Sequence, residues 1–162
     1  MPDRLGQKRI RVARRRRPRA APAPLRHGPL PGLIGYQLRL AQLAVFSDFA
    51  HSVGALGVSP GRAGILLLVE ANPGVTQSRL AEAVGLDRST MVPVLDQFEA
   101  RGLVERRRGE DRRTNGLWLT RTGKTLVARM KRGIAAHENR IAERLAAHER
   151  DLLLDLLRRL GN

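Results

Sequence analysis

Residues 76–120 read TQSRLAEAVGLDRSTMVPVLDQFEARGLVERRRGEDRRTNGLWLT, and this stretch decides the fold. Thr76 is a helix N-cap residue in front of a short apolar-periodic run, and Gly85 ends that run. Asp87 caps a second helix, which continues to about residue 101 and is ended by Gly102. The pattern therefore predicts two helices joined by a tight turn.

A β-hairpin is expected directly after the second helix. Residues 103–108 form its first strand, the turn-rich tip reads GEDRRTNG, and residues 117–119 form the returning strand. Residues 101–113 contain six arginines against three acidic residues. Such a concentration of like charge favours an anionic partner, although a solvated charged loop would give the same pattern.

The second helix has two different faces when its residues are placed at 100° intervals. One face is apolar, with Met91, Val94, Leu95 and Phe98. The opposite face carries Ser89, Val92, Pro93, Asp96 and Gln97, flanked by Arg88 and Thr90. A recognition helix needs this division, because apolar residues fix it to the protein while polar and Arg side chains meet base edges. An ordinary amphipathic helix has the same division, so the hairpin arginines favour the DNA-binding interpretation.

Long apolar helices are expected on both sides of this unit. Residues 33–56 carry apolar side chains at spacings of three or four, and residues 60–71 form a helix that stops at Asn72-Pro73-Gly74. Thr120 or Thr122 begins a helix of about 25 residues, roughly 37 Å long, that runs to Leu145. A final amphipathic helix follows. The outer helices have no obvious cover within one chain, and a homodimer would supply it.

Composition limits the possible functions. Thirty Lys and Arg against fifteen Asp and Glu give a net charge of +15, which indicates a polyanionic partner. Twenty-seven of the thirty are Arg, which suits phosphate and guanine contacts, although a GC-rich genome would give the same bias. The lack of cysteine excludes disulfides and Cys-based zinc sites.

No apolar run approaches the roughly 20 residues of a membrane span, and no apolar signal core follows the basic N-terminus. We therefore expect a cytoplasmic protein without a membrane partner. An organelle transit peptide is a minor alternative for the arginine-rich start.

Residues 1–29 have their own composition, with ten Lys and Arg, one acidic residue and five prolines. The prolines and the repelling charges predict a disordered basic arm. It is either a tail without function or an arm that adds nonspecific affinity for phosphate. Residues 30–162 then form one domain.

The motifs LAEAVGLDRSTMVPVLDQFEARGLVER, EDRR and LWLTRTGKTL occur together and in this order. In this combination the chain resembles the winged helix-turn-helix proteins of the MarR (multiple antibiotic resistance regulator) family over roughly residues 33–160. The resemblance implies a mainly α fold with a small β-hairpin wing. It implies a winged helix-turn-helix over about residues 58–120 and dimerisation helices over about 32–56 and 121–161.

The resemblance also implies a dimeric transcription factor, usually a repressor, that binds a palindromic operator and is released by a small anionic or phenolic ligand. The recognition-helix contacts correspond to Arg88, Ser89, Thr90 and Pro93, and the wing arginine and its supporting aspartate to Arg113 and Asp111. The predicted DNA-binding set also includes Ser78, Arg106 and Arg112. The family's redox-sensing cysteine is missing from this chain.

Pro93 departs from the family pattern, in which a polar or basic residue is more usual. Its ring removes the hydrogen bond to the Ser89 carbonyl and is expected to bend the helix. Pro93 lies on the face expected to meet DNA, where it would contact a thymine methyl or alter the fit in the groove. The base preference of relatives therefore does not transfer.

The resemblance places an effector pocket between the first, second and fifth helices, near the dimer interface. The candidate lining residues are Tyr36, Arg39, Phe46, His51 and Arg62. Phe46 would otherwise be a core residue, and Arg39 and His51 ordinary surface residues. The stretch LIGYQLRLAQLAVF looks like members that control aromatic-acid catabolism, so an aromatic acid or its CoA thioester is the expected ligand.

Two other classes of function compete with this interpretation. A sequence-indifferent nucleoid or RNA-binding protein would use the basic arm, but five aromatic residues are few for stacking on RNA bases. An enzyme is not expected, because the four histidines lack metal-ligand spacing and no nucleophile–base set or Gly-rich phosphate loop is evident. No cofactor and no metal site are expected.

Overall fold

The computed structural model describes residues 25–108 and 115–161. It is mainly helical, as predicted. The helices are α1 (Ile34–Ser52), α2 (Pro60–Ala71), α3 (Gln77–Ala83), α4 (Arg88–Ala100), α5 (Arg121–Ile141) and α6 (Ala147–Gly161), with single 3-10 turns at Leu30–Gly32 and Gly54–Leu56. None of the helices in the described part is both long and apolar enough to cross a bilayer.

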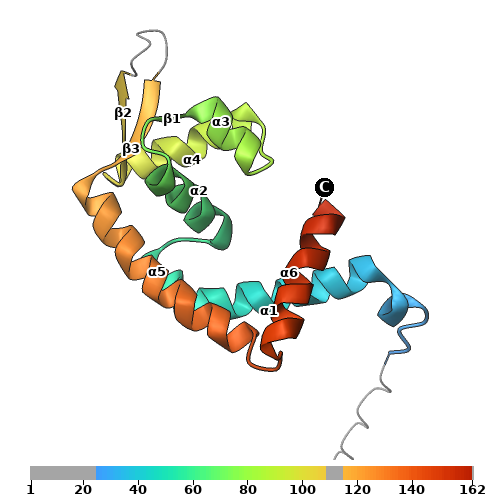
Figure 1. Ribbon diagram of the computed structural model, residues 1–162. Coiled ribbons are helices and arrows are strands. Elements are labelled where there is room, and N and C mark those ends of the chain that lie inside the picture. The colour runs from blue at the N-terminus through green and yellow to red at the C-terminus, as the bar shows by residue number, and fades with distance from the viewer. Residues whose placement is uncertain (1–24, 109–114, 162) are drawn as a thin grey trace, which may run out of the picture.

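The strands form a small sheet at one end of the molecule (Figure 1). They are β1 (Val75–Thr76), β2 (Val104–Arg108) and β3 (Asn115–Leu119), in the order β1-β3-β2. Both pairings are antiparallel, with Val104 opposite Leu119 and Val75 opposite Leu117. The hairpin was predicted, whereas β1 was not, because two residues are too short for an alternating pattern.

The core lies where α2, α3 and α4 pack against the sheet and the first half of α5. Its fully buried large side chains come from all of these elements: Leu66, Val69, Leu80, Met91, Leu95, Phe98, Leu117, Val127 and Met130. The predicted apolar face of α4 is inside this core, with Val94 partly buried beside it. The sequence periodicity therefore identified the packing face correctly.

The helix α5 joins this winged unit to α1 (Figure 1). Its cap is Thr120, whose hydroxyl accepts a hydrogen bond from the Gly123 N–H at 3.0 Å. The first turn of α5 packs against the backbone of Leu103, the residue before β2. A Cβ added at Gly123 would lie 2.0 Å from the carbonyl oxygen of Leu103. Only glycine permits this approach, so residue 123 fixes the angle at which α5 leaves the sheet.

A polar cluster fastens α1 to the second half of α5. His137 is buried, and its Nδ1 lies 2.6 Å from an oxygen of Asp48. Arg140 donates two hydrogen bonds of 3.0 Å to the same carboxylate and contacts Ser52. The hydrogen bonds from Arg140 and then from His137 hold the pKa of Asp48 well below its usual range. The cluster therefore anchors the two helices by charge as well as by packing.

Two predicted helix ends were too late in the sequence. The first helix was expected to reach residue 56, but α1 ends at Ser52 and a 3-10 turn precedes Gly57, whose φ is +67°. The fifth helix was expected to include Leu145, but α5 ends at Ile141. A turn follows, and Glu149 accepts a hydrogen bond from the Ala146 N–H at 2.8 Å. No glycine or proline marks that turn, so the apolar spacing continued past the end of the helix.

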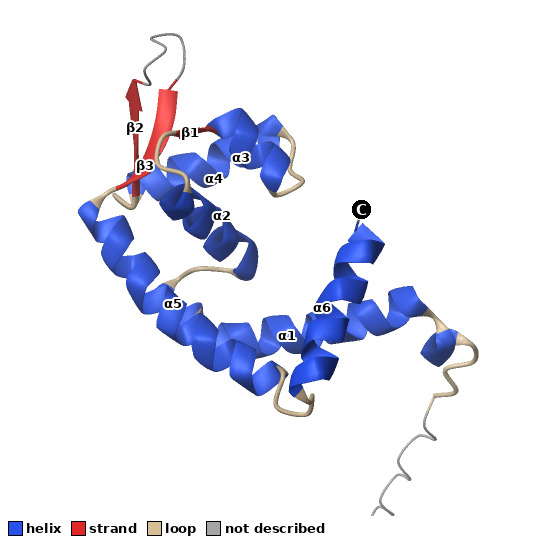
Figure 2. Ribbon diagram, in the orientation of Figure 1, coloured by secondary structure: helices blue, strands red, loops and turns tan. Residues whose placement is uncertain are grey.

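The helices α1 and α6 lie at the end of the molecule remote from the sheet (Figure 2). Every described residue of α6 is exposed, and α1 buries only Phe49. Their exposed large apolar residues are Leu33, Ile34, Leu38, Leu40, Leu43 and Phe46 from the first helix and its lead-in, and Leu152, Leu153, Leu154, Leu156, Leu157 and Leu160 from the last. These faces are uncovered within a single chain.

Candidate nucleic-acid interface

The first turn of α4 is held by its cap, Asp87. One carboxylate oxygen accepts hydrogen bonds from the Ser89 hydroxyl at 2.6 Å and the Thr90 N–H at 2.7 Å, and the other accepts one from the Thr90 hydroxyl at 3.1 Å. The bond from the Ser89 hydroxyl and those from Thr90 lower the pKa of Asp87. The helix therefore begins at a fixed residue, with Arg88, Ser89 and Thr90 all exposed around its N-terminus.

The polar face of α4 lies opposite the core, as its periodicity predicted. Val92, Pro93, Asp96 and Gln97 are exposed, whereas Met91 and Leu95 are fully buried. The helix continues from Arg88 to Ala100 through Pro93. The predicted bend at Pro93 stays a prediction, but its exposure on the outward face agrees with the sequence analysis.

The third helix begins beside this face. Thr76 caps α3 by accepting a hydrogen bond from the Arg79 N–H at 3.4 Å. Ser78, predicted to contact DNA, is exposed in the first turn, and Arg79 is exposed next to it. Arg79 was not among the predicted contacts, although its position next to Ser78 in a helix-turn-helix was a signal available in the sequence.

Arg106 connects the wing to the recognition helix. Its guanidinium donates a 2.9 Å hydrogen bond to Asp96 and a second hydrogen bond to Glu99, so one side chain bridges β2 and α4. The predicted DNA contact is thus paired with two carboxylates that would otherwise repel a phosphate backbone. The geometry assigns Arg106 a positioning contact between the two elements.

Arg62 makes a similar contact from the opposite side of α4. It lies in the first turn of α2 and donates a hydrogen bond to the side chain of Gln97. Arg62 was predicted as an effector contact, but the structure places its guanidinium on the recognition helix. Gln97 is therefore held in place from α2 as Asp96 and Glu99 are held from β2.

Trp118 packs against the side chains and backbone of the wing. The guanidinium carbon of Arg107 lies 5.7 Å from the centre of the indole ring, and Arg107 is also paired with Glu105. The ring fits against two glycines, because a Cβ at Gly116 would lie 2.5 Å from it and Gly74, with φ +84°, is also in contact. The indole ring of Trp118 therefore packs against Gly74, Gly116 and the Arg107 side chain.

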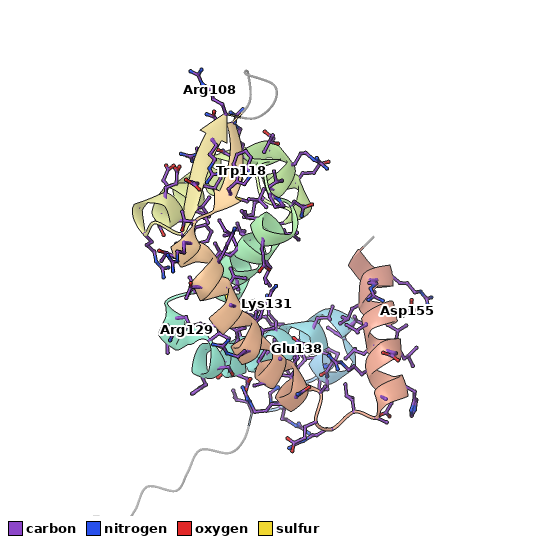
Figure 3. The ribbon with its side chains drawn as sticks, turned by 60° about the vertical axis from the view of Figure 1, so that its left-hand side comes forward. Arg108, Trp118, Arg129, Lys131, Glu138 and Asp155 are labelled. Atoms are coloured by element: carbon purple, nitrogen blue, oxygen red, sulfur yellow. The ribbon has the colours of Figure 1, made fainter. Side chains whose placement is uncertain are left out.

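Arg108 is exposed at the end of β2 and extends beyond the sheet, above Trp118 (Figure 3). It is the last described residue before the tip. The predicted tip contacts Asp111, Arg112 and Arg113 lie outside the described residues. Among the residues described, Arg108 is thus the wing cation placed farthest along the hairpin toward that tip. Arg107 and Arg108 belong to the arginine-rich hairpin, but neither was among the predicted contacts.

These elements match a known family. Residues 56–114 match the model of the MarR family. A relative from Thauera aromatica, described as a putative transcriptional regulatory protein for the hcr operon, is 39% identical over 140 residues, which are 85% of this chain and 84% of the relative. The chain belongs to the MarR family. It is therefore related to transcriptional regulators and not to enzymes.

Solved structures of transcriptional regulators share both sequence and shape with this member of the family. The repressor CouR bound to a 23-mer DNA duplex is 41% identical with a TM-score of 0.81, covering 86% of this chain and 100% of that one. CouR bound to p-coumaroyl-CoA is 39% identical with a TM-score of 0.79, covering 86% and 99%. PcaV from Streptomyces coelicolor, in complex with its natural ligand, is 33% identical with a TM-score of 0.74, covering 82% and 94%.

In this MarR-family chain the other four effector candidates all lie on α1. Three of them contact residues that are not effector candidates, and the fourth, Phe46, is exposed. Tyr36 is half-buried with its hydroxyl 3.3 Å from His27 Nδ1, and Arg39 donates to Gln42 at 3.1 Å. His51 Nδ1 lies 2.7 Å from the Ser47 carbonyl oxygen. Phe46 is exposed, so the core position considered for it is wrong within a single chain.

Two hollows of the winged unit are lined by other residues. One, of about 110 Å³, lies beside Trp118 and Lys124, and the other, of about 480 Å³, lies between the end of α4 and the first half of α5. None of the five effector candidates lines either hollow. Within residues 25–108 and 115–161, these two hollows therefore do not include the predicted effector contacts.

Proposed function

We propose that the chain is a dimeric transcriptional repressor that binds a palindromic operator and is released from it by a small anionic aromatic ligand. The observation that carries the DNA-binding part is the capped, outward polar face of α4 beside the arginine-bearing strand β2. Both elements pack on one core and are linked to each other by Arg106, so they would approach a duplex as one surface. Binding to a chromosomal operator would place the protein in the cytoplasm.

Two copies would present two recognition helices to successive major grooves of one duplex. The uncovered apolar faces of α1 and α6 support this arrangement, because a second copy would bury them. A twofold dimer requires a palindromic or nearly palindromic site. The contacts that we assign to DNA are Ser78, Arg88, Ser89, Thr90 and Pro93 from the helices, and Arg108, Asp111, Arg112 and Arg113 from the wing.

The proposed ligand is an aromatic acid or its CoA thioester. The similarity to CouR, solved with p-coumaroyl-CoA, supports this class. Tyr36 and Phe46 would provide apolar contacts, and Arg39 and His51 polar ones, along α1. Because Phe46 and its neighbours are exposed in one chain, we propose that the pocket is completed only when the second copy covers α1.

Arg62 suggests how a ligand would reach the recognition helix. Any anion that attracts the Arg62 guanidinium would compete with Gln97, which sits on the outward face of α4. Loss of that contact would loosen α4 from α2. This makes Arg62 the effector candidate with the most direct contact to the DNA-binding surface.

Competition binding tests the central part of this proposal. A palindromic site is first selected from random duplexes. The full chain should then stay bound to this site in excess random DNA at about 150 mM salt, with an affinity at least ~10³ times its affinity for random DNA. Equal affinity for every duplex would instead favour a sequence-indifferent nucleic-acid binder. Thermal unfolding with aromatic acids and their CoA thioesters then tests the ligand, and a screen without any stabilising compound would contradict that class.

The wing assignment is tested by charge removal. Arg108→Gln and Arg113→Ala should each weaken operator binding and lower the slope of log K against log salt by about one unit. A matched control is Arg144→Gln, which removes one charge from the turn after α5. Unchanged affinity and slope in both wing variants would mean that the hairpin does not touch DNA.

Arg106 requires a double-mutant cycle with Asp96. If Arg106 acts by holding and neutralising the acids of α4, Arg106→Gln should cost much less in an Asp96→Asn background than in the parent chain. If Arg106 contacts DNA directly, the two changes should be additive in the free energy of operator binding.

A further inference from the structure

The hollow of about 480 Å³ between α4 and α5 has a distinctive lining. It consists of three arginines, two threonines and two leucines: Arg101, Arg121, Arg129, Thr122, Thr125, Leu103 and Leu126. No carboxylate contributes to it. Its volume is within the range of small-molecule sites.

The positive charge of the lining is not neutralised by neighbouring acids. Across residues 25–108 and 115–161, the recorded ion pairs involve none of these three arginines. Two other cations of α5 do make ion pairs, Lys131 with Glu70 and Arg140 with Asp48. Three unpaired guanidinium groups around one hollow attract an anion, because each lacks a fixed counter-charge.

Arg101 is already held in position. Its guanidinium donates hydrogen bonds of 2.9 Å to the Gly57 carbonyl and 3.2 Å to the Leu56 carbonyl, which belong to the turn between α1 and α2. These acceptors are neutral, so they orient the group without cancelling its charge. A cation fixed in this way loses less side-chain entropy when it binds a ligand.

The two other arginines are placed by the periodicity of α5. Arg121 and Arg129 are eight residues apart, with Thr125 between them, so all three lie along the same side of the helix. The buried side chain of Leu103 and the partly buried Leu126 form the apolar part of the lining. The hollow therefore has cations from two elements around an apolar base.

This hollow is separate from the nucleic-acid interface. Arg101 follows the last residue of α4, whereas the DNA contacts proposed on that helix extend from Arg88 to Pro93, roughly 12–20 Å away at 1.5 Å per residue. Figure 3 shows Arg129 along α5, well away from Arg108 at the end of the wing. A duplex held by α4 and the wing would approach the opposite end of the recognition helix.

We propose that this hollow binds a small molecule that carries a phosphate or diphosphate group. Guanidinium groups match phosphate oxygens with paired, charge-assisted hydrogen bonds, and a diphosphate spans two such groups. Because Arg101 joins the end of the recognition helix to the α1–α2 turn, a phosphate bound to its guanidinium would lie against both elements. The site would therefore report the binding of such a phosphate group to α4.

Calorimetric titration of the full chain with inorganic pyrophosphate, at low ionic strength, tests this site. We expect saturable binding with one pyrophosphate per chain. The double variant Arg121→Gln/Arg129→Gln should bind at least about tenfold more weakly, since charge-assisted hydrogen bonds are lost. Arg121→Lys/Arg129→Lys, which keeps the charge without the fork, should lie between them.

The matched control is Arg132→Gln/Arg144→Gln, which removes the same charge from exposed residues outside the hollow. Equal weakening in the two glutamine pairs would show general charge attraction and overturn the proposal. Operator affinity should not change in Arg121→Gln/Arg129→Gln. A loss of operator affinity with a lower salt slope would assign these arginines to DNA and overturn the separate site, while leaving the repressor proposal intact.

Discussion

Leucine side chains are buried in the core of the winged unit and exposed on the outer helices. In the winged unit, Leu66 and Leu95 are wholly buried. In α6, six leucines are exposed to between 40% and 57% of their surface. Full burial of one leucine is worth roughly 1.5–3 kcal/mol relative to exposure. One half of the chain has thus completed its core, whereas the other half needs a partner to do so.

The contrast extends to the stability of each element. The helix α6 has 15 residues and buries none of them within the chain. An isolated helix of this length is marginal in water. The recognition helix is shorter, at 13 residues, yet it is capped, anchored by three fully buried side chains and tied to its neighbours. We infer that dimerisation stabilises the outer helices, while the winged unit is largely self-sufficient.

Placing charges on the leucine stripe of α6 should have the largest effect. Leu153→Glu/Leu157→Glu would put two carboxylates where we expect a dry interface, and dimer affinity should fall by more than about a hundredfold. Operator affinity should fall together with dimer affinity. Sedimentation equilibrium measures the association constant of the dimer.

The control for this variant is Arg158→Glu, which adds a carboxylate to the charged side of the same helix. It should leave the association constant nearly unchanged. If Leu153→Glu/Leu157→Glu associates as tightly as the parent chain, α6 is not part of the interface.

Glycine substitutions compare tight and loose packing inside the winged unit. Gly123→Ala places a methyl group against the Leu103 carbonyl, and it should lower the free energy of unfolding by about 2–3 kcal/mol. Gly64→Ala, inside α2, meets no atom within 4 Å and should raise that free energy by roughly 0.5–1 kcal/mol. Urea denaturation measures both, and a neutral Gly123→Ala would mean that α5 can shift on the sheet.

Much of this arrangement was predictable from the sequence because its signals are local. Asp87 and Thr120 identified helix starts, and the spacing of Met91, Leu95 and Phe98 identified the buried face of α4. The same reasoning missed contacts between distant residues. Nothing in the spacing of Arg106 or Arg62 shows that their guanidinium groups contact α4.

The polar link between α1 and α5 was missed for the same reason. Asp48 and His137 are 89 residues apart, so no pattern within one helix pairs them. The two late helix ends have a different cause, since apolar spacing continues through the turn after Ile141. Patterns within one element therefore identified the elements and the buried face of α4, although not every helix end, and pairings between elements were missed.

The dependence of the melting temperature on acid pH measures how much the Asp48 cluster contributes to stability. Its pKa is lower in the folded chain than in the unfolded chain, so its contribution to stability is complete above about pH 4 and is lost as the pH falls further. Asp48→Asn should reduce the melting temperature near pH 7 and show a smaller decrease below pH 4. A melting temperature that falls equally with acid in both chains would contradict this assignment.

Cap substitutions should have the smallest effect on stability and a measurable effect on DNA binding. Asp87→Ala removes three hydrogen bonds at the start of α4, so the melting temperature should fall by about 2–4 °C and operator affinity should decrease. The control is Ser59→Ala, because the Ser59 side chain makes no capping hydrogen bond at α2. Equal effects on operator affinity would mean that the first turn of α4 is not a contact.

The contrast between the two halves depends on a second copy covering α1 and α6. The mass of the full chain in solution tests this most directly, by sedimentation equilibrium at the concentrations used for operator binding. We expect the free protein to have twice the 18.0 kDa mass of one chain, and two chains to bind a single operator duplex. A mass of 18.0 kDa for the free protein, with one chain per operator, would contradict it.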